Sequence, residues 1–207
     1  MKVLLVNGSP NKDGCTNAAL QEIVCELQQQ GVETEIFWLG RKAISGCIAC
    51  RSCAETGECI MDDAVNQFRA KAKEADGFIF GSPVHYAAAS GSLTSFMDRL
   101  FFSDSGETFR LKPAAAVAVA RRGGTTAALD QINKYFAISQ MLQVGSCYWN
   151  MVHGMTPQEL QQDEEGLCTM RVLARNMAYL LRCLAAGNAA GIPLPEQEEK
   201  PRTNFIR

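Results

Sequence analysis

Four cysteines lie close together in the first third of the chain, at a spacing that could hold one metal centre. They form a Cys-x2-Cys-x2-Cys-x5-Cys run made of Cys47, Cys50, Cys53 and Cys59. Three thiolates, each separated from the next by two residues, can ligate one compact metal cluster if a fourth thiolate comes from nearby. Zinc sites usually pair two separated Cys-x2-Cys units, so the triplet favours iron–sulfur over zinc. The bacterial ferredoxin run differs, because its last gap is shorter and a proline follows its final cysteine.

Spacing alone does not establish that a metal is bound. The same four residues could be free thiols, disulfides or the remnant of a cluster motif. Four of the other cysteines fall on predicted helices or strands, and we expect most of them to be small buried hydrophobic side chains; these are Cys25, Cys147, Cys168 and Cys183. The odd total of nine cysteines, with only Val3 to Val6 as an N-terminal apolar run, predicts a cytoplasmic protein without a secreted disulfide framework.

A polar loop, residues 8–17, separates the first predicted strand from the first predicted helix. Its sequence, Gly-Ser-Pro-Asn-Lys-Asp-Gly-Cys-Thr-Asn, is rich in small and hydroxyl residues. Such residues ahead of a helix N-terminus offer free backbone N–H groups and a favourable dipole to a phosphate. The loop matches neither the Walker motif nor the Gly-x-Gly-x-x-Gly fingerprint, so a mononucleotide phosphate fits better. The alternative is that Ser9, Asn11 and Thr16 only cap the helix.

Two further loops follow predicted strands and could face the same ligand. In the loop of residues 81–91, small residues would let the backbone approach a flat ring, against which His85 and Tyr86 could stack or hydrogen-bond. In the loop of residues 120–124, Arg121 and Arg122 would favour an anionic ring or a phosphate. A packed histidine and two solvated arginines are the simpler interpretations.

The elements that would position these loops alternate between strand and helix. Five apolar runs are predicted as strands, and amphipathic stretches lie between them; the runs are residues 2–7, 33–39, 77–81, 114–120 and 145–150. This alternation predicts a doubly wound parallel α/β sheet with helices on both faces. Ligands of such sheets bind outside the carboxyl ends of the strands.

One domain is predicted over residues 1–187, with the cysteine-rich loop at residues 46–60, hereafter the cysteine loop. Residues 188–207 contain three prolines and a charged stretch, which predicts an extended C-terminal arm. The formal net charge of −2 gives no electrostatic reason to expect nucleic acid or an anionic membrane as a partner.

The loop motifs resemble those of the flavodoxin-like NADPH-dependent FMN reductases. The motifs are GSPNKDGCTN after the first strand, GSPVHYAAASGSLTSFMDR after the third and the glycine pair after the fourth. The resemblance spans about residues 1 to 185 and implies a flavodoxin-like, five-stranded parallel sheet in the order 2-1-3-4-5 that binds FMN. It implies that the FMN phosphate is held by Ser9, Asn11, Cys15, Thr16 and Asn17. It places the ring along Pro83, Val84, His85 and Tyr86, with its pyrimidine side flanked by Arg121, Arg122, Gly123 and Gly124. Cys15 departs from the serine-like residue of the family, so its contribution would be its backbone N–H.

Within that family, the cysteine spacing is similar to that of iron–sulfur flavoproteins, which carry a 4Fe–4S cluster beside FMN. The leading hypothesis is an FMN-dependent oxidoreductase that passes electrons from NAD(P)H or a reduced protein to a small acceptor or a flavin. The first alternative is an electron carrier without NAD(P)H activity that exchanges electrons with a ferredoxin-like partner. The second is a zinc-binding or thiol redox-sensing module. The residues identify no acid–base catalyst, and the family resemblance implies a homodimer or homotetramer.

Overall fold

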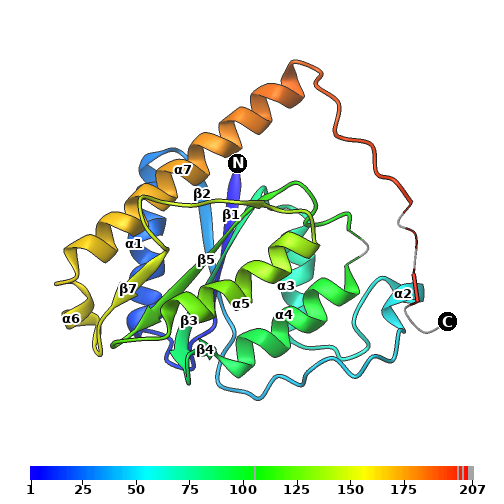
Figure 1. Cartoon of the computed structure of the whole chain (residues 1–207). Helices are drawn as coiled ribbons and strands as arrows, with labels where there is room; N and C mark the ends of the chain where they lie inside the picture. Colours follow the sequence, from blue (N-terminus) through cyan, green and yellow to red (C-terminus); the bar gives the residue numbers. More distant parts are fainter. Residues whose placement is uncertain (105, 200, 202, 205–207) are drawn as a thin grey trace.

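The computed structural model describes residues 1–104, 106–199, 201, 203 and 204, and it shows a parallel sheet between two layers of helices (Figure 1). The parallel path runs β2-β1-β3-β5-β6, and a further short strand, β7, pairs with β5. Counted along the chain this is the predicted order 2-1-3-4-5. The strands are β1 Lys2–Asn7, β2 Glu33–Trp38, β3 Gly77–His85, β4 Ala88–Ala89, β5 Pro113–Ala120, β6 Leu142–Gln143 and β7 Met151–His153.

The helices cover both faces of the sheet. Two of them, α1 Cys15–Gln29 and α7 Glu164–Ala189, pack side by side on one face. The other face carries α3 Ala64–Ala72, α4 Gly91–Ser103 and α5 Thr125–Ile138. Two four-residue helices, α2 Cys53–Thr56 and α6 Pro157–Leu160, lie in connecting segments. None of the described helices is long and apolar enough to cross a membrane.

The first strand explains why the chain forms a sheet buried on both sides. Leu4 and Val6 enter the core beneath α3, α4 and α5, whereas Val3 and Leu5 enter the core beneath α1 and α7. All four side chains are fully buried. A strand with both faces covered has no solvent side, so it reads as a continuous apolar run instead of an alternating one.

The fifth predicted strand is wrong in its position. Residues 144–150 form no strand, and the fifth place is shared by β6 and β7 on either side of them. The Ser146 hydroxyl donates to the carbonyl of Tyr148 at 2.6 Å and to Asn150 Oδ1 at 2.7 Å. Val144 N still donates to the carbonyl of Ala114 at 2.8 Å, and Asn150 O accepts from Ala118 N at 3.0 Å. Between these two contacts with β5 the local bonds of Ser146 hold a turn, which is how serine and asparagine side chains compete with regular structure.

The loop after β1 is pressed against β3 and against the residue that caps α4, at the carboxyl ends of the strands. Gly8 N donates to the carbonyl of Gly81 at 2.9 Å, and the Ser90 hydroxyl donates to the carbonyl of Gly8 at 2.8 Å. A Cβ on Gly8 would lie only 2.9 Å from that Gly81 oxygen, so this approach requires glycine. The two polar loops therefore share one end of the sheet.

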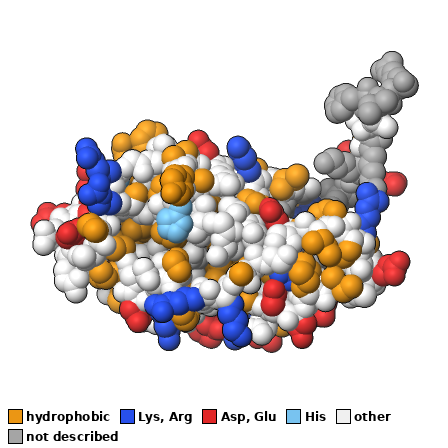
Figure 2. Space-filling view, turned by 90° about the horizontal axis from the view of Figure 1, so that it is seen from below, with side chains coloured by type: hydrophobic (Ala, Val, Ile, Leu, Met, Phe, Trp, Pro, Cys, Tyr) orange, Lys and Arg blue, Asp and Glu red, His pale blue; other side chains and the backbone are white. Residues whose placement is uncertain are grey.

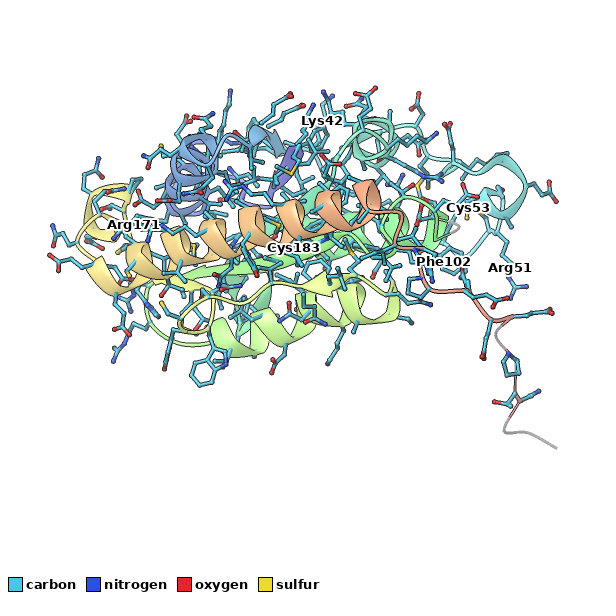
Figure 3. All side chains as sticks on the ribbon, turned by 90° about the horizontal axis from the view of Figure 1, so that it is seen from above. Lys42, Arg51, Cys53, Phe102, Arg171 and Cys183 are labelled. Atoms are coloured by element: carbon cyan, nitrogen blue, oxygen red, sulfur yellow. The ribbon has the colours of Figure 1, made fainter. Side chains whose placement is uncertain are left out.

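The chain leaves the body of the molecule after α7. This helix ends at Ala189, so the C-terminal arm begins at residue 190. Its described residues form neither helix nor strand; Figure 1 shows the arm turning down from the end of α7 to the level of α2, and Figure 3 shows it lying outside the helix layers.

Candidate functional site

A cavity of about 580 Å³ opens at the carboxyl ends of the strands. Four loops surround it, those that follow β1, β2, β5 and β7, together with the end of β3. Figure 2 looks onto this end of the molecule, where uncharged and hydrophobic atoms occupy the middle and Lys and Arg side chains lie toward the rim. The lining residues are Ser9, Asn11, Lys12, Asp13, Gly14, Cys15, Thr16, Arg41, Pro83, Val84, Val119, Ala120, Arg121, Gly154, Met155, Thr156 and Pro157.

The loop after β1 is held in shape by two of its own side chains. Asn7 Oδ1 accepts from Ser9 N at 3.0 Å, and the Ser9 Oγ accepts from Asn11 N at 3.1 Å. Helix α1 then begins behind Gly14, and no described side chain caps its N-terminus. The first N–H groups of a helix lack internal partners, so here they remain available to a bound anion.

Three cationic side chains stand around the same loop. Lys12, Arg41 and Arg121 line the cavity. Arg41 is fixed by a bond from its Nε to the carbonyl of Pro10 at 3.1 Å. Trp38 Nε1 donates to the carbonyl of Ser9 at 2.8 Å and thereby ties the loop to the end of β2. Positive charge beside an uncapped helix N-terminus makes this part of the cavity suited to a phosphate.

Cys15 is the first residue of α1. Burial raises the pKa of its thiol, so the side chain stays neutral near pH 7. A neutral thiol attracts a phosphate little, whereas the backbone N–H of the first helical residue can donate to it.

The structure gathers part of the residues that the sequence singled out. Seven of them line the cavity: Ser9, Asn11, Cys15, Thr16, Pro83, Val84 and Arg121. Six others are not among its lining residues: Asn17, His85, Tyr86, Arg122, Gly123 and Gly124. Their part in binding stays a prediction.

All of those six except Asn17 lie in the β3–β4 hairpin or in the loop after β5, and these two segments touch each other beside the cavity. His85 ends β3, and Tyr86 is fully exposed at the tip of the hairpin to β4, with φ near 50°. Gly124 adopts φ of 94°, and a Cβ there would meet the Cα of Ala87 at 2.8 Å. The glycine pair therefore lets the loop after β5 pack against this hairpin.

The loop after β7 was missed at the sequence level, although it forms one wall of the cavity. Thr156 Oγ1 accepts from Glu159 N at 3.2 Å, and Glu159 Oε2 accepts from Met155 N at 2.8 Å. A Cβ on Gly154 would lie 2.7 Å from Leu160 N, so the turn into α6 is tight. The Thr-Pro-Gln-Glu sequence is typical of a helix N-terminus and could have located this turn.

The four clustered cysteines line a second, small pocket of about 20 Å³. Cys53 Sγ lies 3.9 Å from the carbonyl oxygen of Phe102, and Arg99 Nε donates to Cys59 Sγ at 3.2 Å. Figure 3 shows Cys53 and Phe102 at the same end of the molecule, with Arg51 beside them. Within the described residues, no three His, Cys, Asp or Glu side chains stand close enough together to bind a metal ion. This pocket and the large cavity share no lining residue.

The backbone around Cys50 is unusual. Ala49 and Arg51, its two neighbours, adopt positive φ values of 52° and 62°. Non-glycine residues enter this region at a cost of about 1–3 kcal/mol. The N–H and hydroxyl of Ser52 lower the pKa of the Cys50 thiol. Turns of this kind direct N–H groups inward, as at many iron–sulfur sites.

All nine cysteines are unpaired. The prediction that most of Cys25, Cys147, Cys168 and Cys183 are buried is wrong, because all four are exposed. Three of them lie on α1 or α7, whose inner faces are filled by larger apolar residues. Whether a cysteine on a helix is buried is decided by the face of the helix on which it lies, and its own preference for burial does not override this.

Comparisons with known proteins place this architecture. RosB, solved with 8-demethyl-8-formylriboflavin-5'-phosphate bound, aligns with a TM-score of 0.71 at 15% identity, over 100% of this chain and 92% of that chain. An archaeal flavodoxin aligns with a TM-score of 0.57 at 18% identity, over 88% of this chain and 99% of its own. These likenesses establish a flavodoxin-like fold.

The sequence comparisons are more specific. The family model for NADPH-dependent FMN reductase matches residues 1–156. An iron-sulfur flavoprotein of Methanocaldococcus jannaschii is 35% identical over 191 residues, which cover 89% of this chain and 99% of that protein. The chain therefore belongs to the NADPH-dependent FMN reductase family, in its iron–sulfur flavoprotein branch. This membership makes it an FMN-dependent oxidoreductase.

Proposed function

We propose that the large cavity binds FMN with its phosphate at the N-terminus of α1. The observation that carries this proposal is the uncapped helix start, which opens between Lys12 and Arg41 into the cavity. Backbone N–H groups of residues 14–16 and the Ser9 and Thr16 hydroxyls would hold the phosphate. A dianionic group gains from the helix dipole and from both cations.

The flavin ring would lie along Pro83 and Val84, between the loops after β3 and β5. Val84 and Val119 give one part of this cavity an apolar lining, and Arg121 supplies positive charge in the same cavity. A cation there stabilises a ring that becomes anionic on reduction. Bound FMN supplies the redox chemistry, and the protein supplies position and charge.

The cysteine loop is proposed to hold a 4Fe–4S cluster. Its residue types fit the cluster: four unpaired thiols line one pocket together with Ile48 and Ile60, turns lie on either side of Cys50, and Arg99 donates to Cys59. The four thiols do not converge on a metal site in the described residues, so the bound cluster would draw them together. Thiolate ligands in an apolar setting with hydrogen bonds to sulfur suit iron–sulfur ligation.

As an oxidoreductase the protein needs an electron donor and an acceptor, and we propose NAD(P)H as the donor to FMN with a small molecule or flavin as acceptor. The second candidate is a carrier that exchanges electrons with a ferredoxin-like protein and does not oxidise NAD(P)H. It is favoured by the position of the cysteine pocket at the molecular surface, where Cys47 and Cys50 are exposed. We further propose a reducing, cytoplasmic location, which the nine unpaired thiols support.

The deciding experiment is anaerobic purification followed by a visible absorption spectrum and iron, sulfide and zinc analysis. Flavin bands with about four irons and four sulfides per chain are expected. Adding NADH or NADPH separates the two candidates, because bleaching of the flavin bands supports the reductase. Flavin without iron would contradict the cluster, and zinc without flavin would favour a thiol-sensing module.

A further inference from the structure

The cysteine loop has almost no regular structure of its own, yet one buried side chain ties together the segment that contains it. Arg99 on α4 is 1% exposed. Its Nη1 donates to the carbonyl of Ser45 at 3.5 Å, ahead of the first clustered cysteine. Its Nη2 donates to the carbonyl of Met61 at 2.8 Å, behind the last one. The two ends of the loop are thus fastened to the same guanidinium.

The charge of Arg99 is balanced by Asp63. Nη1 lies 2.6 Å from Asp63 Oδ2, and Nη2 lies 3.0 Å from Asp63 Oδ1, which is a bidentate pair. Asp63 is itself fixed, because its Oδ1 also accepts from Val65 N at the start of α3. A planar guanidinium suits such a fork, which a lysine could not reproduce.

The remaining donor of this guanidinium points at sulfur. Arg99 Nε donates to Cys59 Sγ at 3.2 Å. The backbone of the same cysteine is held by Asn66 on α3, which accepts from Cys59 N at 3.1 Å and donates to Cys59 O at 2.8 Å. Two helices therefore fix Cys59, one at the backbone and one at the sulfur.

We propose that Arg99 is the positioning residue of the cysteine centre: it anchors both ends of the cysteine loop, aims the fourth thiol and favours the reduced state of the cluster. The proposal rests on the proposed cluster. Reduction by one electron from dithionite adds negative charge to the cluster and its sulfurs. A cationic N–H donor to one of those sulfurs stabilises the added charge and raises the reduction potential.

The test compares two variants with the wild type after anaerobic cluster loading. Arg99→Gln removes the positive charge. Arg99→Lys keeps the charge but loses the bidentate pair of hydrogen bonds to Asp63. The matched control is Arg69→Lys, since Arg69 is also a buried arginine, pairs with Asp104 at 3.9 Å and has no cysteine partner. FMN content shows whether each variant folds.

The cluster potential is measured by a redox titration followed by electron paramagnetic resonance. For Arg99→Gln we expect the equilibrium constant for one-electron reduction to fall about tenfold, or ~59 mV. Arg99→Lys should also lower the reduction potential, but by less than Arg99→Gln. If Arg99→Gln binds no FMN, the comparison of Arg99→Lys with the wild type is used instead. Potentials equal to the wild type in both variants overturn the proposal, as does an equal shift in Arg69→Lys.

A second readout works without any metal. In FMN-loaded, iron-free protein, trypsin cleavage after the exposed Arg51 reports how often the cysteine loop opens. We expect cleavage to be roughly tenfold faster in Arg99→Gln and unchanged in Arg69→Lys. If the wild type takes up no iron, the cluster proposal fails, and the cleavage comparison still decides whether Arg99 is the anchor. Equal cleavage rates in Arg99→Gln and the wild type would overturn the proposal that Arg99 anchors the cysteine loop.

Discussion

The hydroxyl of Ser9 has two possible roles in the loop before α1. It accepts from Asn11 N, and Ser9 also lines the cavity proposed to bind the phosphate. Thr16, the second residue of α1, lines the same cavity and is 2% exposed. Ser9 therefore shapes the loop and at the same time faces the proposed phosphate site.

Replacing either hydroxyl should weaken FMN binding. We expect Ser9→Ala and Thr16→Ala each to raise the dissociation constant about tenfold, since a hydrogen bond to a charged group contributes about 1.5–3 kcal/mol. Fluorescence titration of FMN-free protein measures it. Thr94→Ala is the control, because the Thr94 hydroxyl donates to the Gly91 carbonyl on α4 and Thr94 does not line the cavity. An unchanged FMN affinity in both loop variants contradicts the phosphate site.

The two proposed cofactors should be separable at the level of one residue. Because the cysteine pocket and the cavity share no lining residue, Cys50→Ser should remove iron and sulfide and leave FMN in place. Iron analysis and flavin absorbance on one preparation measure both. Cys25→Ser, a change at an exposed cysteine on α1, should alter neither. Loss of both cofactors from Cys50→Ser would mean that the two sites depend on each other structurally.

Between elements, the pairing of α1 with α7 depends on ion pairs as well as on the apolar core. Arg175 Nε and Nη2 donate to the two carboxylate oxygens of Glu26 at 2.9 and 3.0 Å. Glu26 is 5% exposed, and Arg175 holds the pKa of its carboxyl below the usual value. Arg171 and Arg182 continue the same row of contacts to α1.

The Glu26–Arg175 pair should make the free energy of unfolding depend on pH in the acidic range. Because the folded pKa of Glu26 is lowered, the unfolded chain binds more protons below about pH 4.5, so the stabilisation is present above that pH and is lost as the pH falls. Arg175→Met should lower the free energy of unfolding by about 1–2 kcal/mol at pH 7 and by less at pH 4. Urea unfolding at both pH values measures it. Arg182 donates to the neutral Gln30. The Arg182→Met variant should therefore show no such pH dependence.

Local patterns determined which elements the sequence could predict. The strands β1, β3 and β5 are continuous apolar runs, and their position in the sheet is dictated by burial on both faces. The fifth strand was misplaced because Gly145–Asn150 is apolar enough to be read as a strand, whereas the Ser146 hydroxyl closes a turn there. A side chain bonding its own backbone leaves no mark in hydrophobic periodicity.

The parts of the site that follow a recognisable strand could be predicted from the sequence, and the other parts could not. The loops after β1, β3 and β5 could be found because each directly follows a clear strand. The wall at residues 154–157 was missed because it follows β7, which the sequence did not reveal. Arg99 was not recognised because a buried arginine on an amphipathic helix reads as a solvent-facing residue until its partners, 36 to 54 positions away, are known.

At the scale of the whole molecule, the body and the C-terminal arm have different physical character. The body contains both hydrophobic cores, whereas the arm exposes Ile192 and Leu194, each 64% exposed. A bond from Arg110 Nη2 to the carbonyl of Pro195 at 2.8 Å holds the arm near the base of the sheet. We propose that residues 1–189 form the folding and FMN-binding unit.

Ile192 and Leu194 lie two residues apart on the arm, and we propose that a second copy of this chain covers them. Ending the chain after Gly191 should therefore leave FMN content and the urea midpoint nearly unchanged, because few contacts of the body are removed. It should shift the proposed homodimer or homotetramer toward smaller species in sedimentation velocity. The double variant Ile192→Ser, Leu194→Ser keeps the full length, and it should weaken the assembly in the same direction if the apolar contact matters. A full-length protein that sediments as a monomer at all concentrations would contradict this role, and the arm would then be a solvated extension of α7.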